Sequence, residues 1–559
     1  MSNSPKKQNF LQGAALLAIS VAIVKVIGAI YKIPLRAIIG DVGFSYFNTA
    51  YEIYTLLLTI STAGLPIAMS RMISQAYSLG EFNRVRQIYK VSKALFLALG
   101  LVSTLVMAGF CYPLAGVMKQ VDAWPAILCL APCSLLMGFL SAYRGFFQGQ
   151  SNMVPTSISQ VLEALFKLLV GLTAAFVLMK LTNSLALAAA GAILGVTVSC
   201  LISAIYLRLQ FRPAYKELAV SAEEVESFQK TAGKLLSVAI PITIGSAGMQ
   251  LLNVAEIGVY MGRLEDLLET GLYQGELIPI LREEIQVLED YTVEKEYSLM
   301  ASSLKGIYNF AYTIFNMPCA FIIPINTSVL PAITEYLTLG NHAGVKSTEE
   351  SAARITGLLA APCAIGLAVL AGPIMGMLGG YSGLKLELAG QILMVMGIAV
   401  FFYSSVMFTN VLLQSHGKAH IPVINTLICG VAKLIALYFV TGNPAIGILG
   451  VPICSLACYL GVTVLNLACI QVMVPQKPAL LGNLVRALFP AAIMGAAVYG
   501  CYWLLSTVGG ITSNVILCGL PIVVGVVVYG AGVLLTKTLK KEDCLLLPKG
   551  EKLAKLLKL

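Results

Sequence analysis

The chain has 559 residues, of which 58% are hydrophobic and only 11% are charged, and its net charge is +10. Its mean hydropathy of +0.84 is too high for a surface that faces water. This composition excludes the soluble globular classes and places the chain in a lipid bilayer.

Apolar runs of roughly 20 residues, the length that crosses the hydrocarbon core, recur along the whole chain. They predict an all-α integral membrane fold with about fourteen transmembrane helices. The first run follows Lys6 and Lys7 and is too long for a secretory signal, so we expect it to remain as a helix. The expected spans are residues 11–38, 45–69, 92–117, 123–146, 155–179, 185–207, 235–261, 303–333, 354–378, 387–413, 421–441, 444–472, 484–506 and 512–536.

The placement of lysine and arginine predicts the orientation. If the N-terminus lies in the cytoplasm, the alternating spans put most of the 37 basic residues on that side, including the lysines from Lys537 to Lys558. Such an asymmetry is the positive-inside bias, and it predicts that both termini are cytoplasmic. The net positive charge therefore needs no nucleic-acid partner.

Two long polar connections divide the chain. Residues 209–234 form the first connection, which is of mixed charge. Residues 262–302 form the second, which carries ten acidic side chains on the outer side and is either a solvated cap or a gate. The predicted domains are an N-terminal six-helix lobe (1–208), a cytoplasmic linker (209–234), a C-terminal six-helix lobe (235–472) with the outer acidic loop (262–302), and two extra helices with a basic cytoplasmic tail (473–559).

A short sequence motif occurs twice and relates the two lobes. Residues 47–54 read FNTAYEIY, and residues 308–315 read YNFAYTIF. Downstream, the interval from Gln148 to Lys167 equals that from Gln414 to Lys433. Two hydrophobic halves built on one plan are typical of membrane transporters, which bind cargo where the repeats meet.

The charges inside the expected spans indicate the kind of cargo. Charged residues within a bilayer are costly and normally face a cavity or a partner. Cations outnumber carboxylates inside the spans, which favours an anionic cargo. The cations are Lys25, Lys32, Arg36, Lys167, Lys305 and Lys433, and the carboxylates are Glu52, Glu163 and Glu256.

Each of these charges also has a structural interpretation. Glu163 and Lys167 are four residues apart on one helix, and we favour their mutual neutralisation over contact with cargo. Lys433 has no acidic partner in its own helix. Lys25 is the deepest cation and the first candidate for substrate binding.

Three further cations lie near the ends of their spans. Lys32, Arg36 and Lys305 are each either part of the substrate site or extended toward the interface, with the charge in water. Among the acids, Glu256 is either an ion-coupling group or a partner in a salt bridge, and Glu52 has no acidic counterpart in the second repeat.

Neither cysteine nor histidine predicts a metal site or another cofactor. The 13 cysteines are scattered through apolar spans without a Cys-x-x-Cys pair, so we expect small packing residues. His416 and His420 have a spacing that could bind zinc on a helix. We expect no carboxylate or cysteine beside them, which argues against zinc.

Several motifs together resemble the multidrug/oligosaccharidyl-lipid/polysaccharide (MOP) flippase superfamily. They are KVIGAIYKIPLR at residues 25–36, GDVG at 40–43, FFQG at 146–149, NMVP at 152–155 and GKAHIP at 417–422. Their order is most similar to the branch of stage V sporulation protein B and the MurJ-type lipid II flippases.

The resemblance implies two six-helix lobes that form a V, plus two C-terminal helices, in a bacterial plasma membrane. It implies transport of a polyprenyl-diphosphate-linked saccharide, most simply lipid II, with the cell-wall synthesis machinery as a further candidate partner. Lys25 matches a basic residue of the family's cationic cavity, and Glu256 matches an acidic residue expected in the seventh helix. Transport would be driven by membrane potential, sodium or protons.

Other functions stay open at this point. One is a flippase for another lipid-linked polysaccharide unit, and a second is a multidrug or cation antiporter of the same superfamily, for which carboxylates rather than lysines would be expected in the cavity. A membrane-embedded enzyme acting on lipid-linked sugar would need paired catalytic carboxylates or a metal site. The sequence contains no Asp-x-Asp pair.

The orientation can be tested by cysteine labelling in a background without native cysteines. A membrane-impermeant reagent added to intact cells should modify a cysteine at Glu284, in the outer acidic loop, and not one at Glu224, in the linker. Labelling at position 224 in intact cells would reverse the predicted orientation.

Overall fold

The computed structural model describes residues 10–62, 64–218, 226–272, 277–288, 291–510, 513–540 and 543. In this part of the chain every regular element is helical, and eleven helices are long and apolar enough to cross a membrane. A helix satisfies its backbone hydrogen bonds internally, which lipid requires because it offers no partners. The predicted all-α membrane fold is confirmed.

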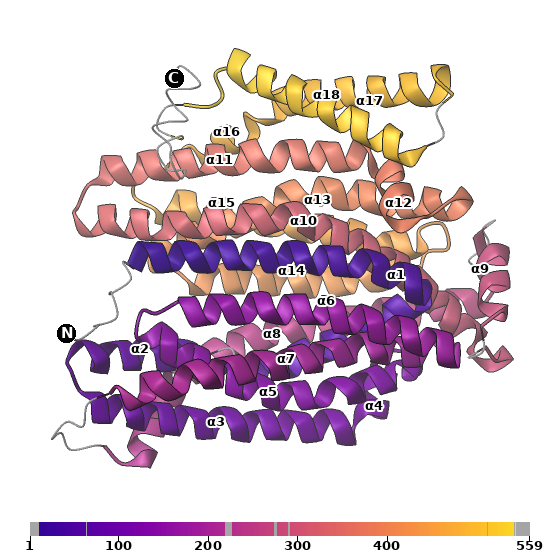
Figure 1. The fold of residues 1–559 in the computed structure, drawn as a ribbon. Coiled ribbons are helices and arrows are strands. Elements are labelled where there is room, and N and C mark those ends of the chain that lie inside the picture. Colours follow the sequence, from indigo (N-terminus) through magenta and orange to yellow (C-terminus); the bar gives the residue numbers. More distant parts are fainter. Residues whose placement is uncertain are drawn as a thin grey trace. The chain divides into compact units, whose positions relative to one another are not determined.

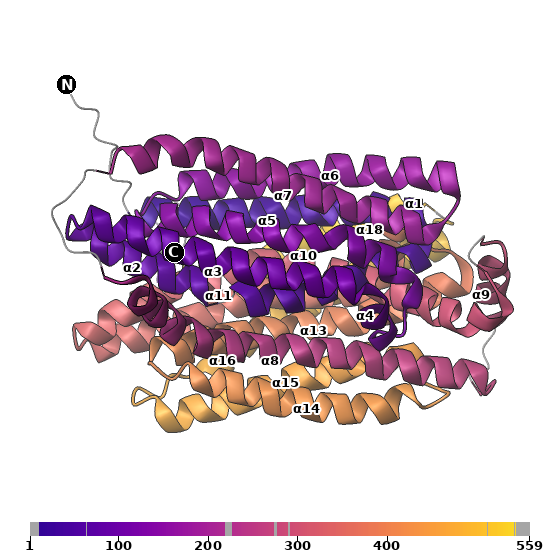
Figure 2. The same ribbon diagram turned by 90° about the horizontal axis from the view of Figure 1, so that it is seen from below.

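The helices form two compact units. The first comprises residues up to Glu269 together with 279–309. Figures 1 and 2 both show its elements α2 and α9 at opposite ends of the long helices. Its elements are α1 (Phe10–Thr62), α2 (Leu65–Ser78), α3 (Phe82–Gly109), α4 (Cys111–Val117), η1 (Val121–Ala123), α5 (Trp124–Gly149), α6 (Val154–Thr182), α7 (Leu185–Lys216), α8 (Phe228–Glu269), most of α9 (Leu277–Gln286), η2 (Val293–Lys295) and the start of α10 (Glu296–Thr338).

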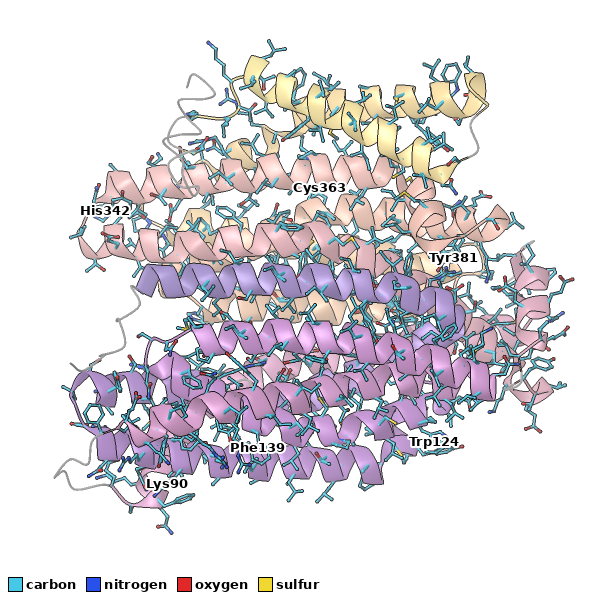
Figure 3. The ribbon with its side chains drawn as sticks, viewed as in Figure 1. Lys90, Trp124, Phe139, His342, Cys363 and Tyr381 are labelled. Atoms are coloured by element: carbon cyan, nitrogen blue, oxygen red, sulfur yellow. The ribbon has the colours of Figure 1, made fainter. Side chains whose placement is uncertain are left out.

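The second unit comprises residues 270–278 and 310–559. A buried salt bridge of 2.8 Å between Arg354 and Asp543 ties its helix α11 to the segment after α18. Figure 3 shows His342 and Tyr381 toward opposite ends of this unit. Its elements are the rest of α10, α11 (His342–Val369), α12 (Ala371–Gly379), α13 (Gly383–Ser415), α14 (His420–Thr441), η3 (Gly447–Leu449), α15 (Gly450–Met473), α16 (Leu480–Val485), α17 (Leu488–Trp503), the π-helical turn η4 (Leu504–Val508) and α18 (Asn514–Leu535).

The predicted spans correspond to helices. Besides the eleven apolar helices of the described residues, α1 contains the two expected spans 11–38 and most of 45–69, and α10 contains 303–333. The boundaries of the compact units differ from those of the predicted lobes. The first compact unit includes α8 and the start of α10, whereas the predicted lobes are divided at the linker 209–234. The division into two lobes stays a prediction.

Helix α1 is two helices joined at a sharp kink. Gly40 has φ 64° and ψ −173°, a conformation open mainly to glycine. In a straight helix Lys32 and Asn48 would be about 24 Å apart, yet Lys32 Nζ lies 3.3 Å from Asn48 Oδ1. The chain therefore turns back at Gly40, and the two halves of α1 face each other.

A tight hairpin joins α6 and α7. Asn183 ends α6 in the left-handed conformation with φ 49°, and the Ser184 side chain accepts a hydrogen bond from Leu187 N and begins α7. The two helices then pack through glycines. A Cβ built on Gly195 would lie 2.4 Å from the backbone of Gly171, so only glycine permits this approach.

We expect Gly195→Ala to destabilise the first unit by about 1–3 kcal/mol, because the added methyl group would push α6 and α7 apart. Gly245→Ala, on α8, is the matched control, since a Cβ there meets no atom within 4 Å. The melting temperature in mild detergent measures both effects. Equal melting temperatures for the two variants would show that close packing at Gly195 is not required.

Candidate functional site

A buried polar site of the first unit surrounds Lys305 of α10. Its side chain is fully buried. The ammonium donates to Thr49 Oγ1 at 2.6 Å and to Gln120 Oε1 at 3.3 Å, and Glu52 Oε2 lies 3.7 Å away. Both Thr49 and Glu52 belong to the second half of α1, so Lys305 ties α10 to α1.

Gln120 completes this network from the turn before η1. Its side chain is almost fully buried. The amide nitrogen donates to Ser45 Oγ and, at 2.9 Å, to Ser302 Oγ, while the amide oxygen accepts from Thr49 and Lys305. One glutamine thus connects α1 with α10 and uses both ends of its amide. Such a closed network can hold a buried ammonium in place of water.

The first half of α1 supplies two further cations. Lys32 Nζ contacts Asn48 and lies 6.0 Å from the centre of the Phe44 ring, across the kink. Lys25 is exposed and has no ion-pair or hydrogen-bond partner among the described residues. Of the predicted substrate-binding cations in this unit, Lys25 is therefore the most available to an incoming anion.

Lys167 of α6 points toward α1. Its ammonium donates to the Tyr51 hydroxyl at 2.8 Å and lies 4.4 Å from the centre of that ring. Glu163 instead pairs with Arg144 at 2.9 Å. Glu163 and Lys167 therefore form no direct ion pair, because a guanidinium from α5 reaches the carboxylate, although the charge of Glu163 still acts on Lys167 as expected.

Two other sequence interpretations also change. Lys305 does not extend to the interface, since it is fully buried beside Glu52. Arg36 is held by two hydrogen bonds to Asp41, of 2.8 Å and 3.2 Å, directly across the Gly40 kink. Its charge is thereby neutralised, which makes Arg36 a weaker candidate for binding cargo.

The remaining predicted residues are placed as follows. Glu256 is half-buried on α8, and its charge acts on Glu52. Lys433 is half-buried on α14, in the second unit. His416 lies 2.6 Å from Glu349 of α11, so the expectation that no carboxylate lies near this histidine is wrong. The described residues contain no group of three or more side chains suited to a metal ion.

We define the central cluster as Lys25, Lys32, Lys167, Lys305, Glu52 and Glu256, which interact electrostatically in the first unit. It contains four cations and two carboxylates. An excess of positive charge within apolar helices attracts an anion strongly, because the surroundings screen it poorly. Lysine ammonium groups, as mobile point charges, suit a ligand that must also be released.

Sequence reasoning missed Thr49 and Gln120 as parts of this site. Thr49 lies in the first copy of the repeated motif, which also contains Glu52, so that repeat was a usable signal. Gln120 gave no such signal in the sequence, because a polar residue at the end of a transmembrane span is common. Its role depends on which helices meet around it.

Comparison with known proteins agrees with this architecture. The sequence profile described as "Polysaccharide biosynthesis protein" matches residues 10–337, more than half of the chain. The chain belongs to the polysaccharide biosynthesis protein family. A second profile, "Lipid II flippase MurJ", matches residues 297–518. The family lies in the MOP flippase superfamily, and this member falls in its stage V sporulation protein B and MurJ branch.

Three individual proteins illustrate the likeness. Stage V sporulation protein B of Bacillus subtilis is 24% identical over 474 residues, which cover 84% of this chain and 85% of that protein. The lipid II flippase MurJ of the same organism is 23% identical, with 76% of each chain covered. A structure of lipid II flippase MurJ in an inward closed conformation matches with a TM-score of 0.64 at 13% identity, over 93% of this chain and 98% of that one. That structural match shows the shared fold.

The Lys305 network makes a prediction about stability. We expect Lys305→Met to lower the free energy of unfolding by about 1–3 kcal/mol, since it leaves buried acceptors without their donor. Lys295→Met is the control, because Lys295 also forms an ion pair, of 2.7 Å with Asp122, but is substantially exposed and should matter by at most about 1 kcal/mol. Denaturation by SDS in mixed micelles measures both. Equal losses would show that burial of Lys305 contributes nothing.

Proposed function

We propose that this protein is a flippase that moves a polyprenyl-diphosphate-linked saccharide, with lipid II as the first candidate, from the inner to the outer leaflet. The observation that carries the proposal is the excess of cations in the central cluster, on long apolar helices. The family supports transport of a lipid-linked saccharide. The choice of lipid II is supported by the match to the MurJ profile.

The charge of a diphosphate fits the central cluster. A phosphate oxygen about 4 Å from one ammonium gains on the order of 4 kcal/mol at an effective dielectric constant of about 20. That gain is comparable to the roughly 2.5–3.5 kcal/mol that a central lysine costs on insertion scales. Lys25, which has no ion-pair partner in the described part of the chain, would meet the diphosphate first. Lys32 and Lys167 would follow, because their present partners are neutral oxygens.

Transport would follow alternating access, with the cargo headgroup entering from the cytoplasmic side and the lobes moving about the bound diphosphate. The same cations would release the headgroup outside when their carboxylate partners compete for them. Glu52 is the leading candidate for that competition, since it already lies 3.7 Å from Lys305. Glu52 and Glu256 are also the candidates for coupling to protons or sodium, with membrane potential as the third source of energy.

The other functions fit the site less well. A flippase for another polyprenyl-linked polysaccharide unit would use the same cations, so it remains the nearest alternative. A multidrug or cation antiporter would need a cavity of excess negative charge, whereas the central cluster is positive. An enzyme acting on lipid-linked sugar would need a catalytic pair, and Glu52, the clearest acid of the cluster, is engaged with Lys305. We place the protein in the bacterial plasma membrane with both termini cytoplasmic and with cell-wall synthesis as its process.

The proposal is tested by rescue of a bacterium depleted of its own lipid II flippase. The wild-type protein should restore growth, whereas Lys25→Ala and Lys433→Ala should not at equal expression. Lys25→Arg, which keeps the charge, should rescue in part. Lys180→Ala is the matched control, because Lys180 is an exposed cation at the end of α6 and is not one of the predicted substrate-binding residues, and it should rescue fully.

The rescue experiment distinguishes an error in the cargo assignment from an error in the proposed role of the cations. Wild-type protein that reaches the membrane without rescuing growth would contradict the lipid II assignment and favour another polyprenyl-linked saccharide. Full rescue by Lys25→Ala would contradict the role of the cationic cluster. Failure of the Lys180→Ala control would show that loss of any cation impairs the protein.

A further inference from the structure

A second basic site lies in the first unit, outside the central cluster. A cavity of about 570 Å³ opens between α3, α5 and α7. Four cations line it, Lys90 and Lys93 from α3 and Arg208 and Arg212 from α7. Figure 3 shows Lys90 and Phe139, which both line the cavity, displaced from Trp124 along the helices, and Trp124 begins α5 at the other end. By the positive-inside bias, this end faces the cytoplasm.

The wall of the cavity is aromatic. The rings of Tyr89 and Phe211 stack with centroids 4.5 Å apart, and Tyr143 packs against Phe211 at 5.1 Å. Lys93 Nζ lies 5.7 Å from the centre of the Phe139 ring, which holds the ammonium at the cavity. The Tyr89 hydroxyl is buried beside Tyr143 without a hydrogen bond of normal geometry in the described residues.

The cations of the cavity are not neutralised by the described chain. No acidic residue lines the cavity, and none of the four forms an ion pair with a residue that the structure describes. Two described carboxylates follow α7 in sequence before α8 begins. Glu217, which directly follows the helix, does not line the cavity, and Glu226 is engaged by Lys234. Its hydrogen bond from Lys234, of 2.5 Å, holds the pKa of the Glu226 carboxyl below its ordinary value. Within the part of the chain that the structure describes, the four cations thus have no anionic partner, which favours the binding of an external anion.

Apolar faces lead from the cavity toward the middle of the membrane. On α3, Leu101, Val102 and Leu105 are exposed beyond Lys93 in the direction of the outer end. On α7, which runs the opposite way, Leu201, Ile205 and Leu209 are exposed on the membrane side of Arg212. A ligand with an anionic head and apolar chains would satisfy both the cations and these faces, which a soluble phosphate would not.

We propose that the cavity between α3, α5 and α7 binds the headgroup of an anionic phospholipid, with its acyl chains along α3 and α7. Basic pockets between membrane helices on the cytoplasmic side recognise such headgroups. The phosphate would accept hydrogen bonds from Lys93 and Arg208, and the aromatic wall would exclude water beneath it. The inference does not depend on the transported cargo, since the cavity shares no residue with the central cluster.

Native mass spectrometry of the purified full-length protein tests this proposal. The protein is mixed with phosphatidylglycerol and phosphatidylcholine that carry the same acyl chains. Wild type should retain phosphatidylglycerol preferentially, and Lys93→Gln/Arg208→Gln should reduce that preference about tenfold or more. The matched control is Arg71→Gln/Lys346→Gln, which removes two exposed cations of the same predicted membrane side outside the cavity and should leave the preference unchanged.

Two further arms make the test decisive. Lys93→Arg/Arg208→Lys keeps both charges and should keep the preference. Loss of the preference in that variant, with gel filtration showing folded protein, would contradict recognition by charge. Equal loss in the control variant would show a bulk-charge effect, and unchanged binding by the neutralised variant would overturn the site. Inorganic phosphate should not displace the lipid; displacement at equal concentration would instead assign the cavity to a soluble phosphate compound.

Discussion

A lysine ammonium placed among apolar membrane helices is stable only where other groups replace the water that it loses. Lys305 meets this requirement in full, with a threonine hydroxyl, a glutamine oxygen and a carboxylate around one buried nitrogen. All three partners come from other elements than α10. The need to satisfy one charge therefore fixes how α1, the turn before η1 and α10 meet.

The kink of α1 makes this arrangement possible. Because the chain turns back at Gly40, the second half of α1 presents Thr49 and Glu52 to α10 while the first half presents Lys32 on the other side of the turn. Arg36 and Asp41 bind each other across the same kink and stabilise it. Helix α1 thus carries both a cation that contacts only a neutral amide oxygen and a carboxylate that already contacts a cation. In the proposed transport cycle, exchange between these two kinds of partner would load and release the diphosphate.

The sequence predicted the fold well because a membrane helix is defined locally, by a run of apolar residues of sufficient length. Even the division of α1 was predicted, as two spans around the Gly40-Asp41 motif. Partners were predicted poorly, because they depend on which helices meet. The four-residue spacing favoured Glu163 with Lys167, yet Arg144 from a different helix takes the carboxylate. Lys305 was ambiguous from its position in the span, and only the buried contacts with Glu52 and Gln120 decided its place. The basic cavity of α3 and α7 had no signal in the sequence beyond a surplus of cations on the side that we predict to be cytoplasmic.

The central claim is that the excess cations of the first unit exist to hold a lipid-linked diphosphate. Mass spectrometry of lipids that remain bound to the protein after purification in mild detergent tests this claim most directly. The account predicts that a polyprenyl-diphosphate-linked saccharide is enriched over its share of the source membrane, and that the enrichment is lost in Lys25→Ala. Recovery of bulk phospholipids alone from the wild-type protein, while a known lipid II flippase treated in parallel retains its polyprenyl lipid, would contradict it.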